Sequence, residues 1–279
     1  MNENQNQTQT QTQSQNKNKN LIVTNYDYQI FQDDRNPDIY EIQFKNPSEH
    51  LINSLIKTRI LLGASASDNY KSLHFKASSV QKFTDFFLYN KVNNKVNNKV
   101  ITINMAAKII NNLATQLNYL ISFSLQTFLG YNTENIIVIN ENTFIYLSSE
   151  HLLRINPKTQ QVLISYPFTS ADFFLSPELK KIKTIPSRVH YKTTYFSLAY
   201  LIVTILQKTK ETQETQETKE TQERISETQK TISETIPNPT SKSNIIQSLD
   251  SLPIKGTKIY WLLKRCLVED PKKRTIIYI

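Results

Sequence analysis

The segment Tyr195–Leu206 constrains the fold most, because ten of its twelve residues are apolar or aromatic. A helix that is apolar on every side must be enclosed by other elements. At about 1.5 Å per residue, the segment rises only about 18 Å, which is too short to cross a membrane as a helix. It is also longer than the usual strand of about four to eight residues. The sequence therefore predicts a helix buried at the centre of a soluble domain, with Thr193 or Thr194 capping its start.

Cysteine and histidine content indicates an intracellular protein without a metal site. Cys266 is the only cysteine, so neither a disulfide framework nor a cysteine-based zinc cluster is expected. His151 and His190 have no companion ligands at metal-binding spacing. The first residues contain no apolar run of the kind that directs secretion. We therefore expect an intracellular location and no membrane segment.

Glycine content excludes the common phosphate-binding loops. The chain has only three glycines, Gly63, Gly130 and Gly256, and they lie far apart. A G-x-G-x-x-G or Walker A loop needs clustered glycines, because its backbone N–H groups approach phosphates closely. The formal charge of +9 favours anionic partners, but no run of five or more basic residues is present. Binding of nucleic acid or of an acidic partner is therefore an alternative and not the main hypothesis.

The first hundred residues predict a tail followed by a small β-rich region. Residues 1–20 contain almost nothing that could be buried, which predicts a disordered tail rich in Asn and Gln. Residues 21–45 contain short apolar bursts that predict two or three antiparallel strands. The other expected elements are a helix that starts with Asn46 as its cap and continues through Ile60, a strand at 73–75, a helix at 79–89 and a low-complexity hinge at 91–100.

The rest of the chain predicts a mainly helical region. Residues 104–123 repeat apolar side chains at helical spacing. The runs IIVI at 136–139 and FIYL at 144–147 predict a hairpin around a polar Asn-Glu-Asn turn. Residues 207–244 carry six basic and seven acidic residues, which predicts a solvated, partly helical or disordered insertion. A final helix is expected at 257–267, because its apolar residues share one face.

This order of elements resembles the protein kinase fold, and several motifs resemble kinase motifs in the same order. FLGYNTEN at 128–135 looks like the catalytic loop H-R-D-x-x-x-x-N, with Asn135 at the position of the metal-binding asparagine. SPE at 176–178 resembles the A-P-E that closes an activation segment. Arg274 in RCLVEDPKKR resembles the arginine that pairs with its glutamate, here Glu178. The segments VHYKTTYFSLAYLI and IYWLLKRCLVEDPKKR are similar to kinase-like proteins of large DNA viruses.

The resemblance implies an α+β fold in two lobes. It implies a small β-rich N-terminal lobe with its hinge at 21–100, and a mainly helical C-terminal lobe at 101–279 that contains the insertion. It also implies that Glu178 and Arg274 form a structural ion pair. The match covers residues 104–279 without the insertion, whereas the first hundred residues match only in outline.

The same alignment leaves uncharged residues where a kinase needs charged ones. Gly130 takes the place of the catalytic aspartate and Asn132 that of the nearby lysine. The D-F-G triplet falls on Ser149-Glu150-His151, so a serine replaces the aspartate that holds Mg²⁺. Lys45 and Lys76 both end strand-like runs, but neither precedes a helix with a suitably spaced glutamate. Because phosphoryl transfer depends on positioning and charge neutralisation, these departures predict the loss of catalysis.

Three hypotheses about function follow. The first is a catalytically inactive kinase-like (pseudokinase) module that binds or scaffolds a protein partner and uses no cofactor. The second is a divergent active Ser/Thr kinase that uses ATP, Mg²⁺ and a displaced carboxylate such as Glu134 or Glu150, with Asn135 as the cofactor-binding residue. The third is a basic protein that binds nucleic acid or an acidic partner.

Two further points remain open in the sequence. Asn135 has an ordinary alternative role, in which it bonds nearby backbone in a loop. The expected intracellular location becomes the host cytoplasm if the protein is viral.

Overall fold

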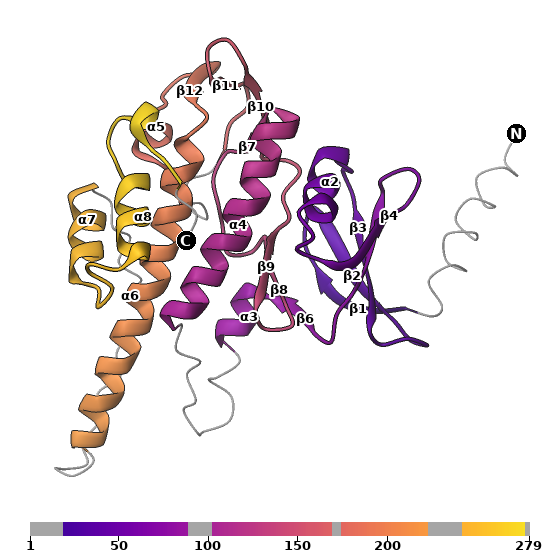
Figure 1. Cartoon of the computed structure of the whole chain (residues 1–279), viewed down its shortest axis with the longest axis horizontal. Coiled ribbons are helices and arrows are strands. Elements are labelled where there is room, and N and C mark those ends of the chain that lie inside the picture. Colours follow the sequence, from indigo (N-terminus) through magenta and orange to yellow (C-terminus); the bar gives the residue numbers. More distant parts are fainter. Residues whose placement is uncertain (1–18, 89–101, 169–173, 223–241, 277–279) are drawn as a thin grey trace, which may run out of the picture. The chain divides into compact units, whose positions relative to one another are not determined.

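The structure, a computed structural model, describes residues 19–88, 102–168, 174–222 and 242–276 (Figure 1). It is a mixed α+β protein with a β-rich N-terminal region and with its long helices later in the chain. The chain divides into two compact units, the first made of Met1–Phe86 and Glu134–Glu150 and the second of Phe87–Thr133 and His151–Ile279. The first unit therefore includes a segment from within the predicted C-terminal lobe. Most of the predicted tail, the hinge at 91–100 and residues 223–241 of the insertion lie outside the described residues.

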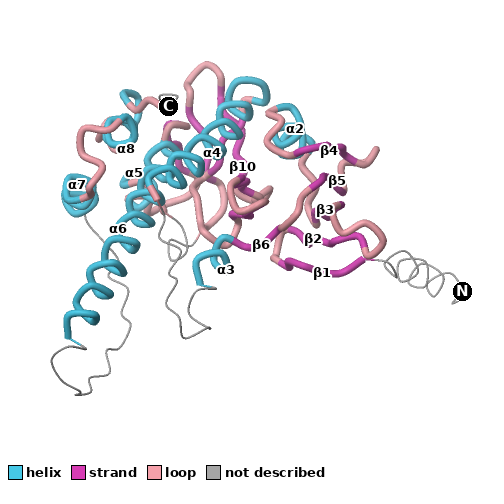
Figure 2. The backbone as a smooth tube through the Cα atoms, turned by 60° about the horizontal axis from the view of Figure 1, so that its bottom comes forward, coloured by secondary structure: helices cyan, strands magenta, loops and turns pink. Residues whose placement is uncertain are grey.

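A five-stranded antiparallel sheet dominates the first unit, in the order β1-β2-β3-β5-β4 (Figure 2). The strands are β1 (Lys19–Thr24), β2 (Tyr28–Asp33), β3 (Ile39–Phe44), β4 (Leu62–Ala66) and β5 (Ser72–Lys76). Alternate residues of the central strands point to one face, where Ile30, Ile42 and Leu73 are fully buried. The predicted strands at 21–45 and 73–75 are confirmed.

Helix α2 (Glu49–Lys57) begins later than the sequence predicted. Its N-cap is Ser48, whose hydroxyl accepts a hydrogen bond from the backbone N–H of Leu51. The expected cap at Asn46 is therefore wrong, because a serine placed two residues later satisfies the first turn. The helix also ends before Ile60, since Arg59 adopts a positive φ of 55°.

A second sheet of the first unit has the order β6-β8-β9. It contains β6 (Val80–Lys82), β8 (Ile136–Ile139) and β9 (Thr143–Tyr146), so the predicted hairpin is confirmed. The helix predicted at 79–89 is wrong in its first part, and α3 spans only Phe83–Leu88. Val80–Lys82 instead pairs with β8, far along the chain, and this pairing overrides the local helical pattern.

The second unit is built around α6 (Thr193–Gln222). This helix contacts α4 (Ile103–Ser124), α7 (Lys242–Ser251) and α8 (Lys258–Cys266), which lie along it in Figure 1. Every residue of Tyr195–Leu206 except Thr204 is buried, so the predicted enclosed helix is confirmed. The helices predicted at 104–123 and 257–267 are confirmed as α4 and α8, whereas α7 was not predicted.

The start and the end of α6 differ from the prediction. Thr193 does not cap the helix in the expected way, because its hydroxyl donates to the carbonyl oxygen of His190 instead of accepting from the first turn. The hydroxyl oxygen of Thr194 is buried and has no hydrogen-bond partner among the described residues. At the other end the helix runs on to Gln222, which is inside the predicted insertion. No helix of the described part of the chain is long and apolar enough to cross a membrane.

A four-stranded antiparallel sheet of the second unit was not predicted. Its order is β12-β11-β10-β7. The strands are β7 (Gln126–Phe128), β10 (Leu152–Asn156), β11 (Gln161–Ile164) and β12 (Ser187–His190). The inner face of this sheet carries a core cluster in which Leu153, Val162 and Val189 pack with Leu179 of the short helix α5 (Pro177–Lys180).

Candidate functional site

Asn135, the predicted cofactor-binding residue, lies just before β8 in the first unit and is buried, with 6% of its surface exposed. The side-chain amide of Asn25 donates to Asn135 Oδ1 over 3.0 Å and to the carbonyl oxygen of Glu134 over 3.0 Å. The carbonyl oxygen of Asn135 accepts from the N–H of Leu147 over 2.8 Å. Both oxygens of Asn135 are therefore engaged within the protein.

Asn25 belongs to the turn between β1 and β2, and this turn also positions Asp27 and Tyr28. Asp27 is 4% exposed, and the hydroxyl of Ser148 donates to its Oδ2 over 3.5 Å. The hydroxyl of Tyr28 donates to the carbonyl oxygen of Glu134 over 3.3 Å. Sequence reasoning missed these residues, and the only available signal was a short polar stretch between two strand-like runs.

The electrostatics of this cluster keep Tyr28 protonated. Burial raises the pKa of the Tyr28 hydroxyl well above its ordinary value, and the neighbouring Tyr146, Asp27 and Glu134 raise it further. A hydrogen bond from Asn25 lowers this pKa, but by less than burial raises it. Tyr28 is therefore a neutral hydrogen-bond donor beside the carboxylate of Asp27.

Ser149, at the predicted magnesium position, lies three residues after β9 in the first unit. Its hydroxyl oxygen is buried and has no hydrogen-bond partner among the described residues. Glu134 and Glu150, the two predicted substitutes, are both exposed. Within the described ranges, no group of three or more His, Cys, Asp or Glu side chains could hold a metal ion.

Gly130 and Asn132 lie in a buried loop of the second unit. Between them, the backbone N–H of Tyr131 donates to the hydroxyl of Ser197 over 2.8 Å, and its carbonyl accepts from the N–H of Phe174 over 2.8 Å. Ser197 is one of the two polar residues in the apolar run of α6. Its hydroxyl therefore fixes this loop to the central helix.

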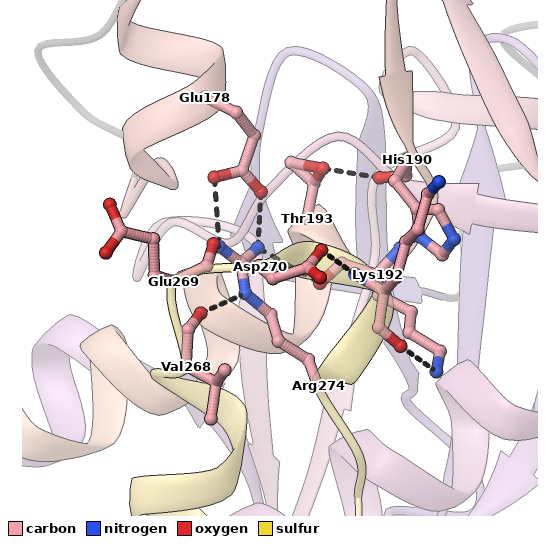
Figure 3. A network of polar contacts seen from close by, with 9 residues as sticks. Glu178, His190, Lys192, Thr193, Val268, Glu269, Asp270 and Arg274 are labelled. Carbon is pink, nitrogen blue, oxygen red and sulfur yellow. Dashed lines mark hydrogen bonds and ion pairs between the residues drawn. The ribbon is translucent and has the colours of Figure 1, made fainter.

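Glu178 and Arg274 are brought together in the second unit by a two-point ion pair (Figure 3). Arg274 Nη2 donates to Glu178 Oε2 over 3.0 Å, and Nη1 donates to Oε1. The arginine side chain is fully buried, and its remaining donors reach the carbonyl oxygens of Val268 at 2.8 Å and Glu269 at 3.1 Å. Its guanidinium carbon also lies 5.1 Å from the ring centre of Phe196. This network joins α5, α6 and the end of the chain.

His190 lies close to this ion pair, in a positively charged setting (Figure 3). Burial lowers the pKa of its imidazole below the ordinary value, and Lys192, Lys272 and Arg274 lower it further. Lys192 Nζ donates to the carbonyl oxygen of Lys272 over 3.2 Å. His190 therefore lies among several cations, whose charge disfavours a metal ion at this position.

Three other residues named from the sequence have ordinary roles in the structure. Lys45 lies just after β3, with its ammonium 5.0 Å from the ring centre of Tyr26. Neither Lys45 nor Lys76 forms an ion pair with a carboxylate in the described part of the chain. Cys266 is buried on α8, and burial raises the pKa of its thiol to about 12, which leaves it unreactive.

No protein-family model matches the chain, and no curated protein matches it. The site must therefore be judged on its own chemistry. The structure joins Glu178 to Arg274 and Asn135 to Asn25, whereas Gly130 and Ser149 supply no charged group. The described part of the first unit provides one buried carboxylate beside Ser148, that of Asp27.

Proposed function

We propose that this protein is a catalytically inactive, protein kinase-like module that binds or scaffolds a protein partner. The observation that carries the proposal is that the side-chain oxygen of Asn135 accepts a hydrogen bond from Asn25. In a kinase, the asparagine at this position helps to hold Mg²⁺. Here it is buried and serves to attach the β1–β2 turn.

The lost charges support the same conclusion. Kinase catalysis needs an aspartate that receives the substrate proton and a second aspartate that holds the metal ion. Gly130 and Ser149 stand at the corresponding positions and can do neither. Removal of a single hydrogen-bond donor that stabilises a transition state already costs about 10²–10³ in rate, so the loss of both carboxylates leaves little catalysis.

The ion pair and the buried loop support the kinase-like part of the proposal. Glu178 and Arg274 are 96 residues apart, and their pairing matches what the resemblance implies for the end of an activation segment. The loop at 128–132 is attached to the central helix through Ser197. A chain that retains such structural contacts without the catalytic groups is suited to binding.

One observation favours a second candidate, a divergent active kinase. Asp27 places a buried carboxylate beside Ser148, next to the position where a kinase has its metal-binding aspartate. This carboxylate comes from the β1–β2 turn, so it could replace the missing group only if it also reached the metal of bound ATP.

Melting temperature measured with ATP, with and without Mg²⁺, distinguishes the two candidates. An active kinase at a nucleotide concentration a hundred times its Kd gains about 2.7 kcal/mol, which raises the melting temperature by about 5–10 °C in a protein of this size. The inactive module shows no Mg²⁺-dependent rise.

Two variants complete this measurement. Asn25→Ala frees the oxygen of Asn135, and we still expect no rise, because Gly130 and Ser149 remain uncharged. A Mg²⁺-dependent rise in the natural protein that disappears in Asp27→Asn would overturn the proposal in favour of the second candidate.

A further inference from the structure

The sheet β12-β11-β10-β7 has one face that is not covered by the core. Its inner face holds Leu153, Ile155, Val162 and Ile164, all of which are buried. Because strand side chains alternate, the residues between them point to the opposite face. Arg154, Leu163 and Arg188 are all exposed there, and Leu163 is 48% exposed.

The strand register sets these three residues in one row across the sheet. Leu163 of β11 is directly opposite Arg188 of β12. The pairing of Ile155 with Val162, continued by one residue, places Arg154 of β10 opposite Leu163. Neighbouring strands lie about 4.8 Å apart, so the two arginines start about 10 Å from each other with the leucine between them.

The segment that contains three of these four strands is rich in basic residues. Residues 151–192 contain seven Lys or Arg residues and only two acidic ones, Asp172 and Glu178. Asp172 lies outside the described residues, and Glu178 is paired with Arg274. Neither Arg154 nor Arg188 forms an ion pair with any carboxylate that the structure describes. Arg154 and Arg188 therefore leave positive charge on this face that no described carboxylate compensates.

We infer that the row Arg188–Leu163–Arg154 is a docking surface for an acidic amphipathic helix of a partner protein. In a helix, residues seven apart lie about 10.5 Å apart on one face, which matches the spacing of the arginines. Two acidic side chains at this spacing meet the arginines, and an apolar side chain three or four residues after the first meets Leu163.

An acidic helix fits this row better than a nucleic acid does. Single-stranded nucleic acids rely on aromatic side chains for base stacking, and the row contains none. Its centre is instead an exposed leucine, which gains from apolar contact and is not matched by phosphate. The inference rests on the proposed binding role and specifies its partner, but it does not depend on the absence of catalysis.

Fluorescence anisotropy of a labelled synthetic helix, titrated with the full chain, tests this inference. The probe carries glutamates seven residues apart with leucines between them, and a matched peptide replaces only the leucines by serine. We expect the leucine probe to bind at least tenfold more tightly. The double variant Arg154→Ala/Arg188→Ala and the single variant Leu163→Ser should each weaken its binding at least tenfold. The exposed Arg265 of α8 provides the matched control, and Arg265→Ala should leave binding unchanged.

Several outcomes would overturn the inference. These are no binding of the leucine probe, equal binding of the two peptides, or an equal loss in Arg265→Ala. Displacement of the probe by double-stranded DNA or by anionic lipid vesicles at equal charge concentration would show a general polyanion site instead. Because the peptide comparison uses the natural protein, it does not depend on how the variants fold. The melting experiment with nucleotide is separate, so the two proposals can fail independently.

Discussion

Replacing Glu178 by alanine lowers the free energy of unfolding of the second unit by about 3–5 kcal/mol, because it leaves the fully buried guanidinium of Arg274 without its counter-charge. Arg274→Ala has a loss of similar size, since it also removes the bonds to Val268 and Glu269. Urea unfolding followed by tryptophan fluorescence measures both, because Trp261 is the only tryptophan and belongs to this unit.

The double variant tests whether these residues act as a pair. Glu178→Ala/Arg274→Ala should cost much less than the sum of the two single losses, because the second substitution removes the charge that the first leaves unpaired. Arg265→Ala is the control for removal of an arginine from the surface, and its effect should stay within about 0.5 kcal/mol. Losses that simply add would show that the ion pair contributes no coupling.

Leu201→Ala lowers the free energy of unfolding by about 3–5 kcal/mol. Leu201 lies at the middle of the apolar run of α6 and has no exposed surface. Truncation removes buried apolar atoms and leaves a cavity that the surrounding helices fill only in part. The same fluorescence-monitored unfolding in urea measures the effect.

Leu163→Ala is the matched control for this change, because Leu163 lies in the same unit as Leu201 and Trp261. Leu163 is 48% exposed, so its truncation removes much less buried surface and should cost well under half as much. Equal effects of the two substitutions would mean that the central helix is not enclosed.

The elements that the sequence predicted correctly have a hydrophobic pattern that indicates their structure without any distant part of the chain. The apolar run of α6 and the repeat of α4 indicate helices without reference to any partner. The IIVI and FIYL runs indicate a hairpin for the same reason, because they pair with each other across a short turn.

The elements that the sequence missed depend on distant partners. The sequence around Val80–Lys82 has a helical pattern. These residues form a strand only because they pair with Ile137–Ile139. Strands β10 to β12 are only four or five residues long, and β10 and β11 flank a turn that contains Pro157. Their alternation of buried and exposed side chains is therefore too short to indicate a strand.

In the candidate site too, some contacts could be expected from the sequence and others could not. The pairing of Glu178 with Arg274 was expected from motif resemblance. The contact between Asn25 and Asn135 joins residues 110 apart and has no sequence signature, because any turn residue with an amide could make it. The role of Ser197 in holding the backbone at Tyr131 could have been suspected from a polar residue within an otherwise apolar helix.

The most direct test of the whole account is transfer of labelled γ-phosphate from ATP with Mg²⁺, measured on the protein itself and on a generic protein substrate. In the proposed kinase-like alignment, Gly130 and Ser149 stand where a kinase has its two catalytic carboxylates, so we predict no incorporation above that of a heat-denatured sample. Incorporation by the natural protein that stops in Asn135→Ala would contradict the account and show that the chain performs kinase chemistry.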